Sequence, residues 1–222
     1  MLRNLFPNVD WADMWEATWE TIYMTGIATV FTFVIGLLLG IILFLTSPYQ
    51  VWANKIVNFL TGSLVNIFRS VPFIVLIILL IPFTKFLIGT IRGPDAALPA
   101  LIIGAAPFYA RMVLLALREI DRGVIEAAKS MGATTGTIIR KVLFPEALPA
   151  LLSGITVTAI ALVGYTAMAG IIGAGGLGNL AFLDGFQRSR EDVTLMATIL
   201  ILVIVFVLQW IGDYFTAKVD KR

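Results

Sequence analysis

Long apolar runs separated by short polar segments dominate the 222-residue chain. Five of these runs have about the 20 residues that a helix needs to cross the hydrocarbon core of a bilayer. They lie at 21–50, 56–84, 96–117, 147–172 and 193–212. Arg69 interrupts the second run, and residues 70–84 alone would reach only about 22 Å at 1.5 Å per residue. We therefore expect that helix to begin before Arg69, or a short helix to precede it.

The composition agrees with this pattern and excludes several functions. Hydrophobic residues make up 59% of the chain and charged residues 14%, whereas soluble domains carry about 25% charged residues. We predict an all-α integral membrane protein with five transmembrane helices. The net charge of +2 is too small for nucleic-acid binding. Because His and Cys are both absent, the usual general base, thiolate metal sites and most nucleophile–base pairs are removed. We expect no catalytic residue, no metal and no cofactor.

The lysine and arginine residues predict the orientation in the membrane, since these residues concentrate on the cytoplasmic side. Apart from Arg111, which lies within the third run, they divide two to one between the two sides of the predicted bundle. The richer side holds Lys55, Arg69, Arg118, Arg122, Lys129, Arg140, Lys141, Lys218, Lys221 and Arg222. The other side holds Arg3, Lys85, Arg92, Arg188 and Arg190. The N-terminus is therefore expected outside, and the C-terminus and the segment 118–146 inside.

The segment 118–146 is a polar insert between the third and fourth runs, and its first half has the signals of a short helix. Asp121 can cap the first turn through its side chain. Val124, Ala128 and Met131 are spaced so that they fall on one helix face. Gly132 is a natural stop, because glycine tolerates a left-handed conformation. The insert is too short and too polar to span the membrane.

The second half of the insert predicts another short helix at an angle to the first. Thr134 or Thr135 can cap a helix over 136–144. Pro145 and Pro149 then restrict the backbone after that helix. An amphipathic helix lying at the membrane interface, which needs no partner, explains the same pattern. The residues alone leave open whether the insert docks another protein or lies at the membrane interface without a partner.

Four residues in or near the spans are candidates for a transport pathway. Arg69 and Arg111 lie where charges are costly and often functional, although both can also extend to the cytoplasmic interface. Tyr165 and Met168 lie in the glycine-rich fourth span, where small residues favour close helix contacts. Met168 is soft enough to repack as a gate residue, and ordinary packing is the alternative for both.

The stretch 173–178, GAGGLG, fits the dinucleotide fingerprint G-x-G-x-x-G. That fingerprint requires a preceding strand and a following helix, but here an apolar span precedes it. We instead expect a flexible external connection in which glycines permit tight turns and close helix packing, with a role in an outer gate.

The insert resembles the EAA coupling motif of bacterial ABC-importer permeases. The resemblance rests on Glu126-Ala127-Ala128, Gly132, Ile138 and Leu143-Phe144-Pro145. The segments 65–73, 104–113, 163–170 and 173–178 look like permeases of the methionine-uptake type. The resemblance covers a permease domain over 18–218, which leaves an extracytoplasmic extension at 1–17 and a cytoplasmic tail at 219–222.

This resemblance implies a multi-pass subunit of the bacterial cytoplasmic membrane, surrounded by lipid, that imports an amino acid, above all methionine. Its implied partners are a second permease copy, a dimer of a separate ABC ATPase and an extracytoplasmic binding protein. The insert would supply short cytoplasmic coupling helices between spans three and four. The implied coupling residues are Glu126 as the anchor, Ala127 and Ala128 for a close fit, Gly132 for the turn, and Met131, Ala133, Arg140 and Pro145.

Two alternatives remain for the function. A permease of this kind could take a related amino acid or a small peptide. An ion-coupled carrier is less consistent with the sequence, because no acidic residue lies inside the five runs and five spans cannot form two equal inverted halves.

Overall fold

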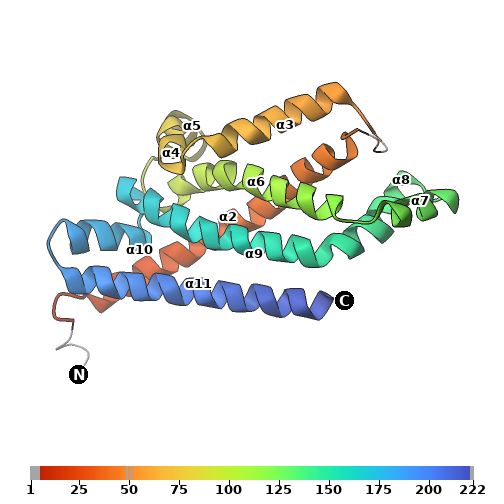
Figure 1. The fold of residues 1–222 in the computed structure, drawn as a ribbon. Coiled ribbons are helices and arrows are strands. Elements are labelled where there is room, and N and C mark those ends of the chain that lie inside the picture. The colour runs from red at the N-terminus through yellow and green to blue at the C-terminus, as the bar shows by residue number, and fades with distance from the viewer. Residues whose placement is uncertain (1–5, 49, 51, 221–222) are drawn as a thin grey trace. The chain divides into compact units, whose positions relative to one another are not determined.

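The computed structural model describes residues 6–48, 50 and 52–220, and in these ranges the regular structure is helical, with no strand. The helices, with η for π-helical turns, are α2 (Trp11–Leu45), α3 (Lys55–Ser70), α4 (Phe73–Leu79), α5 (Ile81–Ile88), α6 (Pro94–Arg118), α7 (Arg122–Ser130), α8 (Thr135–Ile138), η1 (Ile139–Leu143), α9 (Phe144–Ala169), η2 (Gly170–Ala174), α10 (Gly176–Asn179), η3 (Leu180–Phe186) and α11 (Glu191–Val219) (Figure 1).

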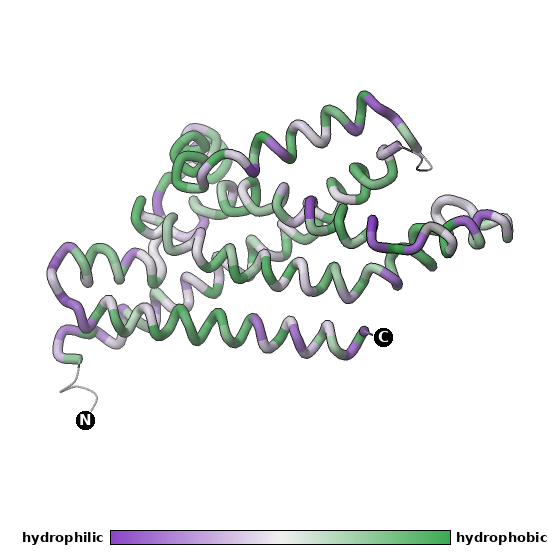
Figure 2. Tube along the Cα trace, in the orientation of Figure 1, coloured by the Kyte–Doolittle hydropathy of each residue, from purple (hydrophilic) through white to green (hydrophobic). Residues whose placement is uncertain are grey.

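Four helices of the described chain are long and apolar enough to cross a membrane, which confirms the all-α membrane class. They are α2, α6, the continuous helix Thr135–Ala174 and α11. Figure 2 shows the apolar residues along them. The predicted second span is broken: α3 passes Arg69 and ends at Ser70, and α4 starts at Phe73. Only if this bent pair counts as one span are there five. Pro72 explains the break, because it has no N–H to donate and restricts the residue before it.

The first helix begins earlier than the apolar pattern predicts. It starts at Trp11 and ends at Leu45, whereas the apolar run covers 21–50. Asp10 caps the start, since its Oδ1 accepts a hydrogen bond of 2.8 Å from the Ala12 N–H. Residues 11–17, which we expected in an extension, are thus the first turns of α2. The acidic residues that precede the apolar run lie inside the helix, because the helix dipole favours Asp and Glu near a helix N-terminus.

The chain forms two compact units, each built from three separate stretches. The first unit comprises Met1–Phe31, Val71–Gly104 and Ala159–Gln209, and the second comprises Thr32–Ser70, Ala105–Thr158 and Trp210–Arg222. The core of the first unit packs Met14 and Ala17 of α2 against Leu177, Met196 and neighbouring apolar residues. The larger core of the second unit joins the ends of α2 and α6 to the insert that contains α7 and α8.

Tyr109 belongs to the core of the second unit. Its side chain is fully buried, and its hydroxyl donates a hydrogen bond of 3.2 Å to the Leu151 carbonyl. Its ring lies beside Phe33, with 5.7 Å between ring centroids. Gly36 and Gly154 lie directly against it, so that stretches of α2, α6 and α9 approach closely here.

Candidate functional site: the segment 118–146

The predicted N-terminal cap of α7 is present. The Asp121 Oδ1 accepts a hydrogen bond of 2.6 Å from the Gly123 N–H, and α7 runs from Arg122 to Ser130. This cap satisfies one of the N–H groups that have no partner within the helix. The first half of the insert therefore forms the short helix that the sequence predicts.

The buried face of α7 differs from the predicted one. Ala128 is buried, but Val124 and Met131 are 47% and 82% exposed. The buried partner of Ala128 is Ile125, and both belong to the core of the second unit together with Ile138. A residue three or four positions away from Ala128 in either direction can lie on the same face of the helix. The larger side chain of Ile125 takes the inner position, so that Met131 remains on the surface.

The turn after α7 is fixed by its backbone. Gly132 has φ +79°, which confirms the predicted left-handed stop. The Gly132 N–H donates to the Lys129 carbonyl at 2.9 Å, and the Ala133 N–H donates to the Ala128 carbonyl at 3.0 Å. This pair of bonds is the Schellman arrangement, which satisfies carbonyl groups at a helix end. The direction in which the chain leaves α7 is therefore set by hydrogen bonds and not by loose loop residues.

The second helix of the insert starts as predicted and ends differently. The Thr134 Oγ1 accepts a hydrogen bond of 3.3 Å from the Thr137 N–H and caps α8. The helix does not stop near Phe144 but continues through η1 into α9. The prediction of a separate short helix over 136–144 is therefore wrong at its C-terminal end. Pro145 lies just after η1 and inside the continuous helix Thr135–Ala174, so that its missing N–H interrupts the ladder of helix bonds at this π-helical turn.

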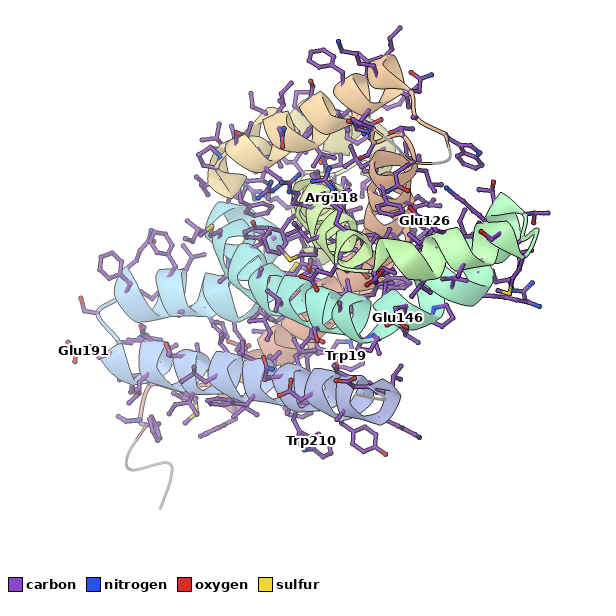
Figure 3. All side chains as sticks on the ribbon, turned by 45° about the vertical axis from the view of Figure 1, so that its right-hand side comes forward. Trp19, Arg118, Glu126, Glu146, Glu191 and Trp210 are labelled. Carbon is purple, nitrogen blue, oxygen red and sulfur yellow. The ribbon has the colours of Figure 1, made fainter. Side chains whose placement is uncertain are left out.

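The coupling residues that the resemblance implies lie on one continuous insert of the second unit. Most of them are exposed: Glu126, Ala127, Met131, Gly132, Arg140 and Pro145. Ala133 is half-buried, and only Ala128 is buried. Figure 3 labels Glu126 on α7. Within the described chain, no hydrogen bond or ion pair holds the Glu126 carboxylate. A cap, a left-handed turn and a packed inner face thus present an exposed, largely small-residue surface with one acidic group.

The four pathway candidates are divided equally between the two units. Tyr165 and Met168 belong to the part of α9 in the first unit, whereas Arg69 and Arg111 belong to the second unit. The Tyr165 ring stacks on Phe73, with 4.4 Å between centroids and 2° between planes. Met168 is 43% exposed. Arg69 is exposed at the end of α3, and Arg111 is half-buried on α6. A pathway role for these residues stays a prediction.

The glycine-rich stretch 173–178 is not a dinucleotide site, because a helix and a π-helical turn precede it and no strand does. It forms a tight connection between α9 and α10, with positive φ at Gly173, Gly175 and Gly176. Two residues of α2 that the sequence did not single out bind its backbone. The Gly176 N–H donates to the Glu20 Oε2 at 2.6 Å, and the Leu177 N–H donates to the Thr21 Oγ1 at 2.9 Å. An acidic residue directly before an apolar run was the only signal in the sequence.

Known proteins are similar to all or a large part of the chain. The family described as binding-protein-dependent transport system inner membrane component matches residues 36–221. The methionine import system permease protein MetP of Bacillus subtilis is 64% identical over 222 residues, which cover 100% of both chains. The D-methionine transport system permease protein MetI of Escherichia coli is 54% identical over 140 residues, which are 63% of this chain and 64% of that protein.

Solved structures agree with these sequence matches. A chain of the inward-facing MetNI methionine ABC transporter has a TM-score of 0.93 and 44% identity, and the match covers 96% of this chain and 100% of that one. An amino acid ABC transporter with histidines has a TM-score of 0.73 at 21% identity, which is a likeness of fold alone.

Proposed function

This chain belongs to the family of inner membrane components of binding-protein-dependent transport systems, and we propose from that premise that it is the permease of an ATP-driven methionine importer. The observation that carries the substrate is the 64% identity to the Bacillus subtilis methionine permease along the complete chain. The chain carries out no covalent chemistry in this function. ATP is hydrolysed by a separate subunit, and the permease changes between states that open to opposite sides of the membrane.

We propose that the exposed surface of α7 and the following turn is the place where the ATPase subunit docks. Three features support this role. The Asp121 cap and the Gly132 turn hold the shape of the segment, Ala127 leaves room for a close approach, and the Glu126 carboxylate faces outward without a partner in the described chain. A rigid, pre-formed surface reduces the entropy that binding would otherwise lose.

The remaining partners of the proposal are a second copy of the permease and an extracytoplasmic binding protein. The family description, which names dependence on a binding protein, supports the second of these. The orientation in the proposal has the N-terminus outside and the C-terminus inside, because the two-to-one distribution of Lys and Arg residues favours it.

Uptake into proteoliposomes tests the function. The permease is reconstituted with its ATPase subunit, ATP is enclosed in the vesicle lumen, and the binding protein and labelled methionine are added outside. We expect ATP-dependent accumulation of methionine that excess unlabelled methionine abolishes and that unrelated amino acids leave unchanged. Accumulation of a different amino acid or of a small peptide in preference to methionine would replace the proposed substrate.

Substitution of Glu126 tests the docking surface in the same vesicles. We expect Glu126→Ala to lower uptake by about fivefold or more, because the proposal makes Glu126 one of the few residues of an interface whose truncation costs more than about 1 kcal/mol. Glu16→Ala is the matched control, since Glu16 is an exposed glutamate on α2 of the first unit. Equal uptake by the two variants would remove Glu126 from the docking surface.

A further inference from the structure

The break between α9 and α10 has caps on both of its helix ends, and each cap is a side chain. The first N–H groups of a helix and its last carbonyl groups have no partner within the helix. Here the Glu20 carboxylate and the Thr21 hydroxyl of α2 accept from the N–H groups of Gly176 and Leu177 at the start of α10. At the other end, the Asn179 Nδ2 donates to the Gly170 carbonyl at 2.9 Å.

The two α2 residues are well suited to this task. Thr21 is 2% exposed and uses both functions of its hydroxyl, since it also donates to the Ala17 carbonyl at 2.9 Å. The Glu20 carboxylate is half-buried, and a negative charge at a helix N-terminus is favoured by the helix dipole. Leu177 is fully buried, so that water cannot easily replace the bond from its N–H. In the conformation described, the caps therefore satisfy backbone N–H groups that would otherwise lack a partner.

The glycines of the connection leave room for these contacts. A Cβ at Gly175 would collide with the Glu20 carboxylate, and one at Gly176 would lie 2.8 Å from the Thr21 Oγ1. Both glycines have positive φ, 82° and 78°. Both α2 and the connection 173–178 therefore contribute to this close approach, although Glu20 and Gly176 are separated by 156 residues in the sequence.

The connection in turn fixes the end of α9. A Cβ at Gly178 would collide with the backbone of Ala167, and one at Gly170 would lie 2.5 Å from the Asn179 N. α10 is therefore packed directly against the end of α9 at Ala167 and the start of η2 at Gly170. Met168, which is 43% exposed, and Tyr165 lie on the last turns of α9. If these two residues move relative to α2, either the hydrogen bonds of Glu20 and Thr21 break or the connection 173–178 stays with α2 and separates from α9.

We infer that Glu20 and Thr21 are positioning residues of transport, which form a latch that holds the connection 173–178 and with it the end of α9. The latch holds in the conformation described and opens when the permease changes state. This inference rests on the proposed transport function and goes beyond it, because it assigns a role to α2 in the control of α9. Glu20 and Thr21 act through the backbone of the connection and do not need to touch the substrate.

Hydrogen exchange of the reconstituted complex with its ATPase and binding protein tests the latch directly. In Glu20→Ala the Gly176 N–H loses its acceptor, and we expect peptides covering 173–180 to exchange about tenfold faster or more, as for loss of a bond to a charged acceptor. Glu20→Gln keeps an oxygen that accepts from this N–H and is expected to restore most of the protection. Glu16→Ala is the matched control, one turn earlier on the same helix, and is expected to exchange like the wild type.

The uptake of methionine per ATP hydrolysed is the second measurement. A variant that merely folds poorly loses uptake and ATP hydrolysis together, and its peptides exchange faster in both units, α7 included. A broken latch is expected to lower the methionine transported per ATP by about fivefold in Glu20→Ala, while Glu20→Gln and Glu16→Ala keep the wild-type ratio. Faster exchange spread over both units with an unchanged ratio would overturn the inference.

Two further outcomes would also overturn it. Wild-type exchange over 173–180 in Glu20→Ala would show that the Glu20 carboxylate does not protect the backbone of the connection. Glu20→Gln as impaired as Glu20→Ala would show that hydrogen-bond acceptance is not what the residue supplies. The exchange measurement requires no substrate, so that a failure of the latch can be distinguished from a failure of the proposed methionine transport.

Discussion

Single glycines decide how closely the helical stretches of the second unit approach each other. Gly40 of α2 lies against Val113 and the Ala110 carbonyl of α6, and a Cβ built on it would lie 2.5 Å from the Val113 Cβ. By contrast, a Cβ at Gly26 of the same helix meets nothing within 4 Å. Small residues are the usual means of close packing between membrane helices, since lipid tails provide no hydrophobic drive for association.

Substitution of these two glycines by alanine is therefore expected to have opposite effects on stability. Gly40→Ala should destabilise the protein by about 1–3 kcal/mol, because backbones or side chains must move apart to admit the methyl group. Gly26→Ala should be neutral or slightly stabilising, because alanine is the better helix former. The midpoint of thermal unfolding in detergent measures both. Equal midpoints for the two variants would contradict the packing observed at Gly40.

A second contact at this scale is the stack of Tyr165 on Phe73 in the first unit. The rings are nearly parallel, with centroids 4.4 Å apart, and Phe73 is the first residue of α4 after the break at Pro72. The pair therefore joins the start of α4 to the part of α9 that carries Met168. Gly104 of α6 also lies against the Phe73 ring, with 3.2 Å from a Cβ at Gly104 to the Phe73 Cδ2.

We expect Tyr165→Phe to keep this contact and Tyr165→Ala to lose it. Aromatic pairs contribute about 0.5–1.5 kcal/mol beyond the apolar area that they bury. Tyr165→Ala should thus unfold earlier than Tyr165→Phe and also than Phe73→Leu, which keeps apolar volume at the same place. If Tyr165→Phe is as impaired in uptake as Tyr165→Ala, the hydroxyl and not the stack is what transport needs.

At the scale of elements, the sequence predicts the helices well where apolar residues are continuous. The cap at Asp121 and the stop at Gly132 were also predictable, because each depends on neighbouring residues alone. The start of α2 was missed because a helix can begin in polar sequence before it enters the apolar region. The inner face of α7 was missed because the choice between Val124 and Ile125 depends on a core to which several other elements contribute. The contacts of Glu20 and Thr21 were missed for the same reason.

The turn after α7 offers a matched test of the candidate site. Gly132 has φ +79° and nothing within 4 Å of a Cβ built on it, and Gly136 has an equally open surrounding without a positive φ. Gly132→Ala is therefore a test of backbone conformation alone. A non-glycine residue in this region costs about 1–2 kcal/mol, which favours a different exit from α7.

Gly132→Ala is expected to lower methionine uptake and the ATP hydrolysis that the permease stimulates, while the amount of inserted protein stays unchanged. Gly136→Ala should behave as the wild type in all three measurements, because it adds the same methyl group to the same exposed segment. Loss of uptake in Gly136→Ala alone would shift the site from the turn after α7 to the start of α8.

At the scale of the whole chain, the orientation in the membrane is predicted by the basic residues and can be tested with introduced cysteines. The chain contains 16 lysine and arginine residues and no cysteine. The uneven distribution of the basic residues predicts the orientation, and the even or odd number of crossings decides whether the termini share a side. The break between α3 and α4 allows either four or five crossings, so that helix lengths do not decide this. Single introduced cysteines report it without background labelling.

Three exposed positions sample the ends of the chain and the insert: Ala12, Ser130 and Lys218. With five crossings and the N-terminus outside, a maleimide that cannot cross the membrane should label Ala12→Cys in intact cells. It should label Ser130→Cys and Lys218→Cys only after the cells are opened. Four crossings would place both termini on one side, so that Ala12→Cys and Lys218→Cys would respond alike. That outcome would make the α3–α4 pair a re-entrant segment, and labelling of Ser130→Cys in intact cells would contradict docking of the insert to a cytoplasmic ATPase.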